Sequence, residues 1–99
     1  MNYSVTQNGD RTTVFLTGDV DLERSPEARK VLLDTVDQGQ NLVVDMSEVN
    51  YIDSSGVASL VEALQASKKR NLNFSLTDVS EPALKVFKLA RLEKVFDIR

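Results

Sequence analysis

Residues 41–57 read NLVVDMSEVNYIDSSGV, and this stretch decides the fold. Its first part, residues 41–46, is the short apolar run that a strand buried inside a sheet requires. Its last part, Asp-Ser-Ser-Gly at residues 53–56, is typical of a helix start, because aspartate and serine oxygens accept hydrogen bonds from the amides of the first helical turn. The stretch therefore predicts a buried strand that leads through a small loop into a helix.

Strand and helix patterns alternate on both sides of this stretch. Upstream, residues 3–8 and 12–17 are predicted strands around a turn, and a helix is expected from Ser25-Pro26 to Gly39, with Ser25 as its cap. We expect Gly18 to end the second strand. Downstream, the helix that follows Gly56 ends near Asn71, and the remaining predicted elements are a strand over 72–77, a helix over 80–90 and a short closing strand over 92–98.

This order of elements predicts an α/β fold. Strands that alternate with helices become parallel neighbours joined by right-handed crossovers. With 99 residues and three helices, the sheet is expected to be mixed and to contain four or five strands. A chain of this size can bury about two thirds of its unfolded surface. We therefore expect a single compact domain over residues 1–99, with three main helices packed on the sheet.

The composition excludes several kinds of chemistry. The chain has no cysteine and no histidine, so disulfides, thiolate metal sites, cysteine nucleophiles and the Ser-His-Asp triad are impossible. Carboxylates do recur near predicted strand ends, at Asp19, Asp21, Asp45 and Asp53. A small carboxylate-based enzyme therefore stays as one hypothesis, and it would need converging acids and a raised carboxylate pKa. We expect no metal site and no cofactor, because solvated loop carboxylates are common.

Charge and hydropathy narrow the possible partners. Twelve basic and fifteen acidic residues leave a formal charge of −3, which argues against nucleic acid as a partner, since phosphate binding needs a clustered basic field. No apolar run approaches the roughly 20 residues that cross a membrane. The start of the sequence lacks the apolar stretch of a signal peptide. We therefore expect a cytoplasmic protein without direct membrane insertion.

A serine at a helix start also has the physical properties of a switch. Most serines in such places act only as caps. A phosphate on Ser54, however, would lie beside the positive end of the helix dipole and its free amides. It would add about −1.5 to −2 charge beside Asp53 and near Asp19 and Asp21. A partner docked against this acidic edge would then be repelled.

The sequence resembles the STAS domain of bacterial anti-sigma-factor antagonists over almost its whole length. Residues 18–21, Gly-Asp-Val-Asp, are similar to the Gly-Glu-Leu-Asp signature of that family. Residues 45–56 are similar to its central strand, loop and Asp-Ser-[Ser/Thr]-Gly motif, and residues 84–92 to its third helix and the connection that follows. One departure is Ala58, which stands where relatives often carry a second glycine.

The resemblance implies a STAS fold and a partner switch. The unphosphorylated domain would bind an anti-sigma factor that is also a serine protein kinase, and so free the sigma factor. That kinase would phosphorylate Ser54, a serine phosphatase would reverse the step, and the domain itself would not be an enzyme. The partner-binding motif would comprise Asp19, Asp21, Asp53, Ser55 and Gly56. Within it, Ser55 is expected to be the cap and Asp53 to position the turn.

A second function stays open, that of a STAS subunit in an ABC-type lipid transport complex at the inner membrane. Such subunits are also short and similar in fold, but they commonly carry threonine or altered residues in this motif. The intact Asp-Ser-Ser-Gly at residues 53–56 favours the antagonist.

Overall fold

A computed structural model describes residues 3–99, which form seven regular elements. In chain order they are β1 (Ser4–Asn8), β2 (Arg11–Val20), α1 (Ser25–Asp37), β3 (Asn41–Ile52), α2 (Ser54–Lys69), β4 (Phe74–Thr77) and α3 (Glu81–Leu89). Every predicted helix and strand is present except the closing strand. Residues 1 and 2 of the predicted domain lie outside the described part of the chain.

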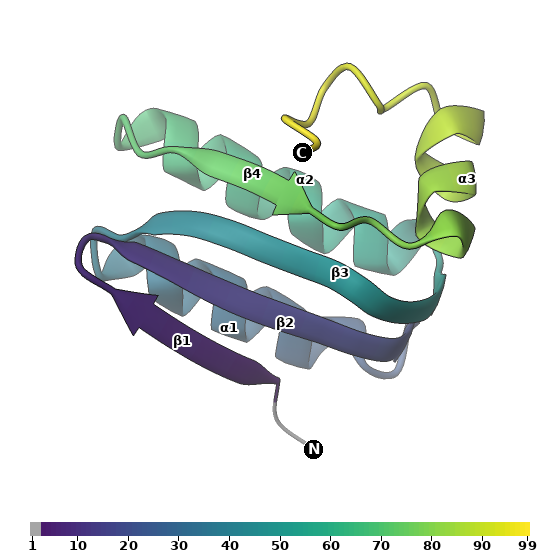
Figure 1. Ribbon diagram of the computed structural model, residues 1–99, viewed down its shortest axis with the longest axis horizontal. Coiled ribbons are helices and arrows are strands. Elements are labelled where there is room, and N and C mark those ends of the chain that lie inside the picture. Colours follow the sequence, from purple (N-terminus) through teal and green to yellow (C-terminus); the bar gives the residue numbers. More distant parts are fainter. Residues whose placement is uncertain (1–2) are drawn as a thin grey trace.

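The strands form one mixed sheet of four, as the element pattern predicted, and their order in the sheet is β1-β2-β3-β4. β1 runs antiparallel to β2 in the expected hairpin, whereas β2, β3 and β4 are parallel neighbours. Because α1 and α2 carry the crossovers between the parallel strands, the carboxyl ends of these strands face the same edge of the sheet (Figure 1).

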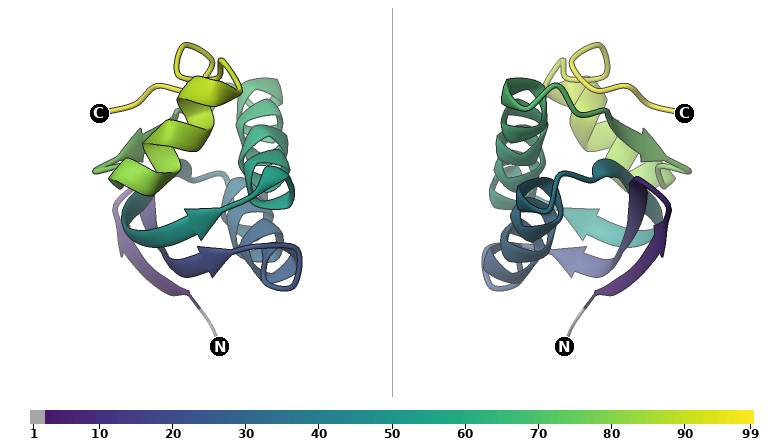
Figure 2. Two further views of the ribbon diagram at one scale, coloured as in Figure 1. Left: turned by 90° about the vertical axis from the view of Figure 1, so that its right-hand side faces the viewer. Right: turned by 90° about the vertical axis from the view of Figure 1, so that its left-hand side faces the viewer.

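Two helices cover one face of this sheet. α1 and α2 lie side by side on it, and α3 lies at the end of the sheet where β4 finishes (Figures 1 and 2). Alternate residues of the strands meet the apolar sides of α1 and α2, which produces a single core. Its largest fully buried side chains include Leu16, Leu32, Leu42, Met46, Ile52, Leu60, Leu76 and Phe87.

The predicted closing strand over residues 92–98 is wrong. Turns dominate this segment, and an isolated bridge between Leu76 and Ile98 joins it to β4. The buried Phe96 ring holds it in place, with its centroid 5.4 Å from that of Phe87 and 6.1 Å from that of Phe74. Aromatic packing positions the segment here, rather than a ladder of backbone hydrogen bonds.

β2 is longer than predicted, because Gly18 does not end it. The strand continues to Val20. Gly18 has a φ of +70°, and the pairing of β2 with β3 shifts register between Gly18 and Asp19. A shift of this kind accommodates a left-handed glycine while the strands continue to pair on either side. Asp19 is consequently a strand residue and not the loop residue that was expected.

The start of α1 also differs from the prediction. Its N-cap is Arg24, which makes no side-chain cap hydrogen bond, and Ser25 is buried inside the first turn. The Asp21 carboxylate instead accepts hydrogen bonds from the backbone N–H groups of Glu23 and Arg24, both at 3.1 Å. The cap prediction for Ser25 is therefore wrong, and an aspartate upstream of the helix satisfies the amides there.

Asp53 is the N-cap of α2, which agrees with the helix start expected from Asp-Ser-Ser-Gly at residues 53–56. Its carboxylate accepts from the N–H groups of Ser55 at 2.9 Å and Gly56 at 3.2 Å, and the Ser55 hydroxyl donates to the same oxygen at 2.5 Å. The Ser55 hydroxyl, together with the backbone amides of Gly56, Ser55 and Leu22, lowers the pKa of Asp53 despite some desolvation. The carboxylate is thus stabilised in its ionised form by donors from two segments.

Gly56 allows the first turn of α2 to approach the sheet closely. A Cβ atom at this position would lie 2.5 Å from the Val20 carbonyl oxygen and 2.7 Å from Cγ1 of Ile52. Both separations are too short for real contacts of a Cβ atom. The missing side chain therefore sets how near α2 comes to the ends of β2 and β3.

Replacing Gly56 with alanine tests this close approach. Helix propensity alone would make Gly56→Ala more stable by about 1 kcal/mol. We expect the clash with the rigid Val20 carbonyl to outweigh it and to cost about 1–3 kcal/mol, measured by urea unfolding. Ser54→Ala on the same turn is the control and should change the free energy of unfolding by less than about 0.5 kcal/mol. A Gly56→Ala protein as stable as the wild type would contradict the close approach.

The Asp53 cap predicts a particular pH dependence of stability. Because folding lowers the pKa of Asp53, its contribution is complete above the unfolded pKa of about 3.9 and is lost as the pH falls through the folded value. At pH 7 we expect Asp53→Ala to be less stable than the wild type by about 0.5–2 kcal/mol. Urea unfolding between pH 7 and strongly acidic pH should show this difference shrinking on the acid side.

The matched control for the cap is Asp53→Asn, which keeps an oxygen acceptor but has no carboxylate to titrate. The difference between Asp53→Asn and Asp53→Ala should stay nearly constant over the same pH range. If the difference in free energy of unfolding between the wild type and Asp53→Ala also stayed constant with pH, the ionised carboxylate would not stabilise the fold.

Candidate functional site

The candidate site lies at the edge where β2 and β3 end and α1 and α2 begin, on the right-hand side of Figure 1. Asp19 lies beside Tyr51 in the register of the two strands, and Val20 lies beside Ile52. The N–H of Asp53 donates to the Val20 carbonyl at 3.4 Å. The parallel pairing therefore brings residues 19–23 and residues 51–56 to one place, which is where ligands bind in open parallel sheets.

The two serines of the motif have different environments. Ser54 is the first residue of α2 and is exposed, and within residues 3–99 its hydroxyl has no hydrogen-bond partner. Ser55 is half-buried, and its hydroxyl donates to Asp53. Ser55 was expected to be the cap, and this is wrong, because Asp53 accepts from the helix amides and Ser55 supports Asp53. Ser54 is the hydroxyl that another protein can reach.

The N–H groups of Ser55, Gly56 and Val57 at the start of α2 are already hydrogen-bonded, whereas free amides were expected from the sequence. Those of Ser55 and Gly56 donate to the Asp53 carboxylate, and that of Val57 donates to the Asp53 carbonyl at 3.0 Å. A phosphate on Ser54 would therefore lie beside an ionised carboxylate, and it could use these amides only by displacing Asp53. Electrostatic repulsion is consequently stronger at this edge than the sequence suggested.

Residues 19–23 form an acidic segment tied to the start of α2. Asp19 and Glu23 are exposed, whereas Asp21 is half-buried and holds the backbone at the start of α1. The Leu22 backbone amide helps to lower the pKa of Asp53, which places this segment beside the motif. Of the predicted strand-end acids, Asp45 does not join this group. It lies inside β3, and its carboxylate accepts from the N–H and hydroxyl of Ser47.

Sequence reasoning missed the residues that hold this segment. The Arg24 guanidinium lies over the ring of the buried Tyr3, 5.6 Å from its centroid. A Cβ atom on Gly18 would lie 2.9 Å from Nη1 of Arg24, so the guanidinium occupies space that the glycine leaves. Gly18 in the Gly-Asp-Val-Asp motif was the one available signal. A contact between an arginine and a tyrosine that are 21 positions apart in the chain has no local sequence pattern.

A groove of about 300 Å³ runs between the first turns of α1 and α2. The ion pair between Arg29 and Glu62, at 2.6 Å, joins the two helices beside it, and both side chains are about half exposed. Ser55 contributes to the lining of this groove, but Ser54 does not. The reachable hydroxyl is therefore on the surface next to the groove and not inside it.

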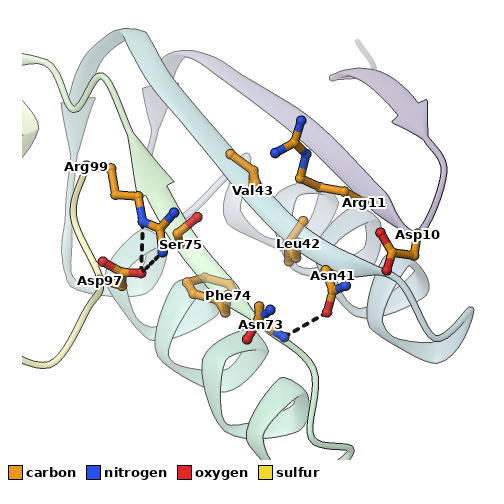
Figure 3. A pocket seen from close by; sticks show the side chains of 10 residues that line it. All are labelled: Asp10, Arg11, Asn41, Leu42, Val43, Asn73, Phe74, Ser75, Asp97 and Arg99. Carbon is orange, nitrogen blue, oxygen red and sulfur yellow. Dashed lines mark hydrogen bonds and ion pairs between the residues drawn. The ribbon is translucent and has the colours of Figure 1, made fainter.

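A larger, polar hollow of about 410 Å³ lies at the opposite end of the parallel strands, where β2, β3 and β4 begin (Figure 3). Arg11 and Arg99 line it, and Arg99 forms an ion pair with Asp97 at 2.9 Å. None of the predicted site residues lines this hollow. It is therefore separate from the Ser54 edge.

The acidic residues do not assemble into a metal site within the described chain. No group of three or more acidic side chains among residues 3–99 is placed to hold a metal ion. The pKa of Asp53 is lowered, whereas a carboxylate that acts as a general acid needs a raised value. None of the helices among residues 3–99 is both long and apolar enough to span a membrane.

Comparison with known proteins identifies sequence relatives that align over nearly the whole chain. The family model described as "Mlab, STAS domain" matches residues 3–98. The anti-sigma-B factor antagonist of Bacillus subtilis (strain 168) is 29% identical over 98 residues, which cover 99% of this chain and 90% of the relative. The protein of the same name from Listeria monocytogenes serovar 1/2a is 26% identical over 103 residues, covering 100% of this chain and 90% of the relative.

Solved structures share the fold. An anti-sigma factor antagonist from Mycobacterium paratuberculosis superimposes with a TM-score of 0.84 at 20% identity, over 98% of this chain and 83% of that one. The anti-sigma factor antagonist SpoIIAA in its unphosphorylated form gives 0.82 at 17% identity, over 98% and 87% of the two chains. The phosphorylated form of Bacillus SpoIIAA gives 0.76 at 17% identity, over 98% and 90%.

These findings confirm the resemblance seen in the sequence. The family model covers almost the whole chain, the relatives are antagonists of anti-sigma factors, and the mixed sheet with its three helices is the arrangement of the solved structures. The chain belongs to the STAS domain family.

Proposed function

We propose that this protein is an anti-sigma-factor antagonist controlled by phosphorylation of Ser54. Its unphosphorylated form binds an anti-sigma factor that is also a serine protein kinase, and this binding frees the sigma factor. The kinase then phosphorylates Ser54 and dissociates, and a serine phosphatase restores the binding form. The proposal is supported by relatives that are anti-sigma-B factor antagonists and by a structural neighbour described in both phosphorylation states.

The single observation that carries the site assignment is the difference between the two serines. The Ser54 hydroxyl is exposed without a hydrogen-bond partner in the described chain, whereas the Ser55 hydroxyl is bound to the Asp53 cap. Phosphorylation of Ser55 would remove a donor from Asp53 and place a second anion against it. Phosphorylation of Ser54 leaves the hydrogen bond from the Ser55 hydroxyl to Asp53 intact.

The phosphoryl transfer uses chemistry that the kinase supplies. The Ser54 oxygen forms a bond to the γ-phosphorus of ATP, the bond to the ADP oxygen breaks, and the serine proton passes to a base of the kinase. The phosphatase reverses the result with water, releasing inorganic phosphate and the free hydroxyl. In this role the antagonist contributes only the acceptor oxygen and the surface that the kinase recognises.

Electrostatics explains how the phosphate would release the partner. The N–H groups of Ser55 and Gly56 already donate to Asp53, so these two donors are not free to bind the added charge of about −1.5 to −2. The formal charge of the protein changes from −3 to about −5, and the change is concentrated beside Asp53 and Asp19. A partner surface that accepts this edge in its hydroxyl form meets two more negative charges after the reaction.

A STAS subunit of an ABC-type lipid transport complex is the second candidate. The matching family model is described as "Mlab, STAS domain" and not as an antagonist, which keeps this alternative in view. The two functions differ in the partner. Purification from native cells together with an ATPase and a permease would support the transport role, and purification with a serine kinase would support the antagonist.

The phosphorylation site can be tested directly. Incubation with ATP and the anti-sigma factor kinase from the same organism should add one phosphate, which intact-mass measurement and fragment mapping should place on Ser54. Ser54→Ala should abolish the modification. Ser55→Ala is the matched control and should leave Ser54 phosphorylated. A phosphate on Ser55 alone, or none with a kinase shown to bind, would overturn the assignment.

The switch itself can be tested by binding. Ser54→Asp adds a negative charge at the acceptor position and should weaken the affinity for the anti-sigma factor kinase by about tenfold or more. Ser54→Ala has no charge and should bind within about twofold of the wild type. Isothermal titration calorimetry of the two variants measures this directly. Equal affinities for Ser54→Asp and Ser54→Ala would refute the switch mechanism.

A further inference from the structure

Two large apolar side chains are exposed at the edge that carries Ser54. Leu22 exposes 76% of its surface and Tyr51 exposes 51%. The other large exposed apolar residues of the described chain, Val5, Leu89 and Val95, lie on β1, α3 and the C-terminal segment. Leu22 and Tyr51 therefore form the apolar part of the surface around the acceptor serine.

The backbone ties both residues to the Ser54 motif. The Leu22 backbone amide lies close enough to the Asp53 carboxylate to help lower its pKa, so the backbone of Leu22 lies near the residue that precedes Ser54. Tyr51 is at the end of β3, three residues before Ser54, and lies beside Asp19 in the register. Neither side chain belongs to the hydrophobic core. Their exposure thus has no explanation in the packing of the domain.

The rim of this surface is acidic. Asp19, Glu23 and Glu48 are exposed on the same ends of β2 and β3 or on the segment after β2. The basic residue of that segment, Arg24, is half-buried and its guanidinium stacks on Tyr3. The surface consequently combines two apolar side chains with a border of carboxylates.

We propose that Leu22 and Tyr51 are the apolar anchors of the partner interface, and that the partner presents an apolar cleft bordered by lysine or arginine. This proposal rests on the proposed function, and it adds the identity of the residues that supply the binding affinity. Leucine and tyrosine side chains supply binding energy when their apolar surface is removed from water, and tyrosine is enriched at the energetic centre of interfaces. The carboxylates of the rim complement a basic border and accelerate the encounter.

Charge also argues against two other occupants. In a symmetric dimer through this surface, each acidic rim would face the acidic rim of the second copy. An anionic lipid surface would repel the same carboxylates. A partner with a basic border is the occupant that both the apolar anchors and the rim fit.

The arrangement also explains why a charge on Ser54 would have a large effect. Ser54 begins α2 at the edge that also carries the two anchors, and these anchors must lose water when the partner binds. A phosphate there would have to lose its own hydration in the same interface, beside Asp53, and this costs far more than covering a serine hydroxyl. The anchors and the acceptor therefore act on one interface.

The test measures binding of the anti-sigma factor kinase to single alanine variants by biolayer interferometry. Leu22→Ala and Tyr51→Ala should each weaken the affinity by about tenfold or more, mainly through faster dissociation. Leu89→Ala is the matched control, because Leu89 is 86% exposed at the end of α3, and it should bind within about twofold of the wild type. The double variant Asp19→Asn/Glu23→Gln should slow association more than it speeds dissociation, with a smaller effect at high salt.

The outcomes separate this inference from the proposed function. If Leu22→Ala and Tyr51→Ala bind like the wild type while Ser54→Asp binds weakly, the anchors are wrong and the switch stands. If Ser54→Asp binds like Ser54→Ala while the anchor variants bind weakly, the switch is wrong and the anchors stand.

The same set of variants provides controls for loss of folding, for dimer formation and for binding to a lipid surface. Urea unfolding should give each anchor variant the stability of the wild type, because both side chains are exposed, and Leu22→Gln repeats the test with the side-chain length preserved. Sedimentation of the wild type as a dimer that Leu22→Ala makes monomeric, or binding to phosphatidylglycerol vesicles that Leu22→Ala abolishes, would overturn the proposed partner.

Discussion

The Asp53 carboxylate is the interaction on which this edge of the molecule depends. It accepts hydrogen bonds from the hydroxyl and N–H of Ser55 and from the N–H of Gly56, and the nearby Leu22 amide helps to lower its pKa, so one ionised group lies between the start of α2 and the segment that follows β2. Hydrogen bonds to a charged acceptor are stronger than those between neutral groups. The same charge keeps the site acidic before any modification. The Asp53 carboxylate therefore both orders the site and supplies the negative charge beside which a phosphate on Ser54 would lie.

The close contact at Gly56 makes this arrangement rigid. Because the Val20 carbonyl would be only 2.5 Å from a Cβ atom at Gly56, α2 begins in direct contact with the end of β2. The Arg24 guanidinium, held between the Tyr3 ring and Gly18, anchors the opposite side of the acidic segment. The exposed residues Leu22 and Ser54 thus project from backbone that is fixed on both sides. Preorganised surfaces lose less conformational entropy on binding than mobile ones.

The sequence predicted the fold where the signal was local. The apolar run at 41–46, the Asp-Ser-Ser-Gly helix start at 53–56 and the hairpin turn gave the order of elements and the mixed sheet. It failed where a distant contact decided the structure. Gly18 was expected to end β2, but pairing with β3 carries the strand past it. The strand pattern after residue 92 was overridden by burial of Phe96 against Phe74 and Phe87.

The sequence also could not predict which hydrogen bonds form at the candidate site. Two adjacent serines at a helix start look equivalent in a sequence, and either can cap. Their roles separate only in three dimensions, because Asp53 takes the cap position and binds the Ser55 hydroxyl, which leaves Ser54 facing solvent. The helix amides that were expected to receive a phosphate are the ones that Asp53 occupies. A phosphate at Ser54 therefore has little to gain from the domain that carries it, and its effect must be felt by whatever docks there.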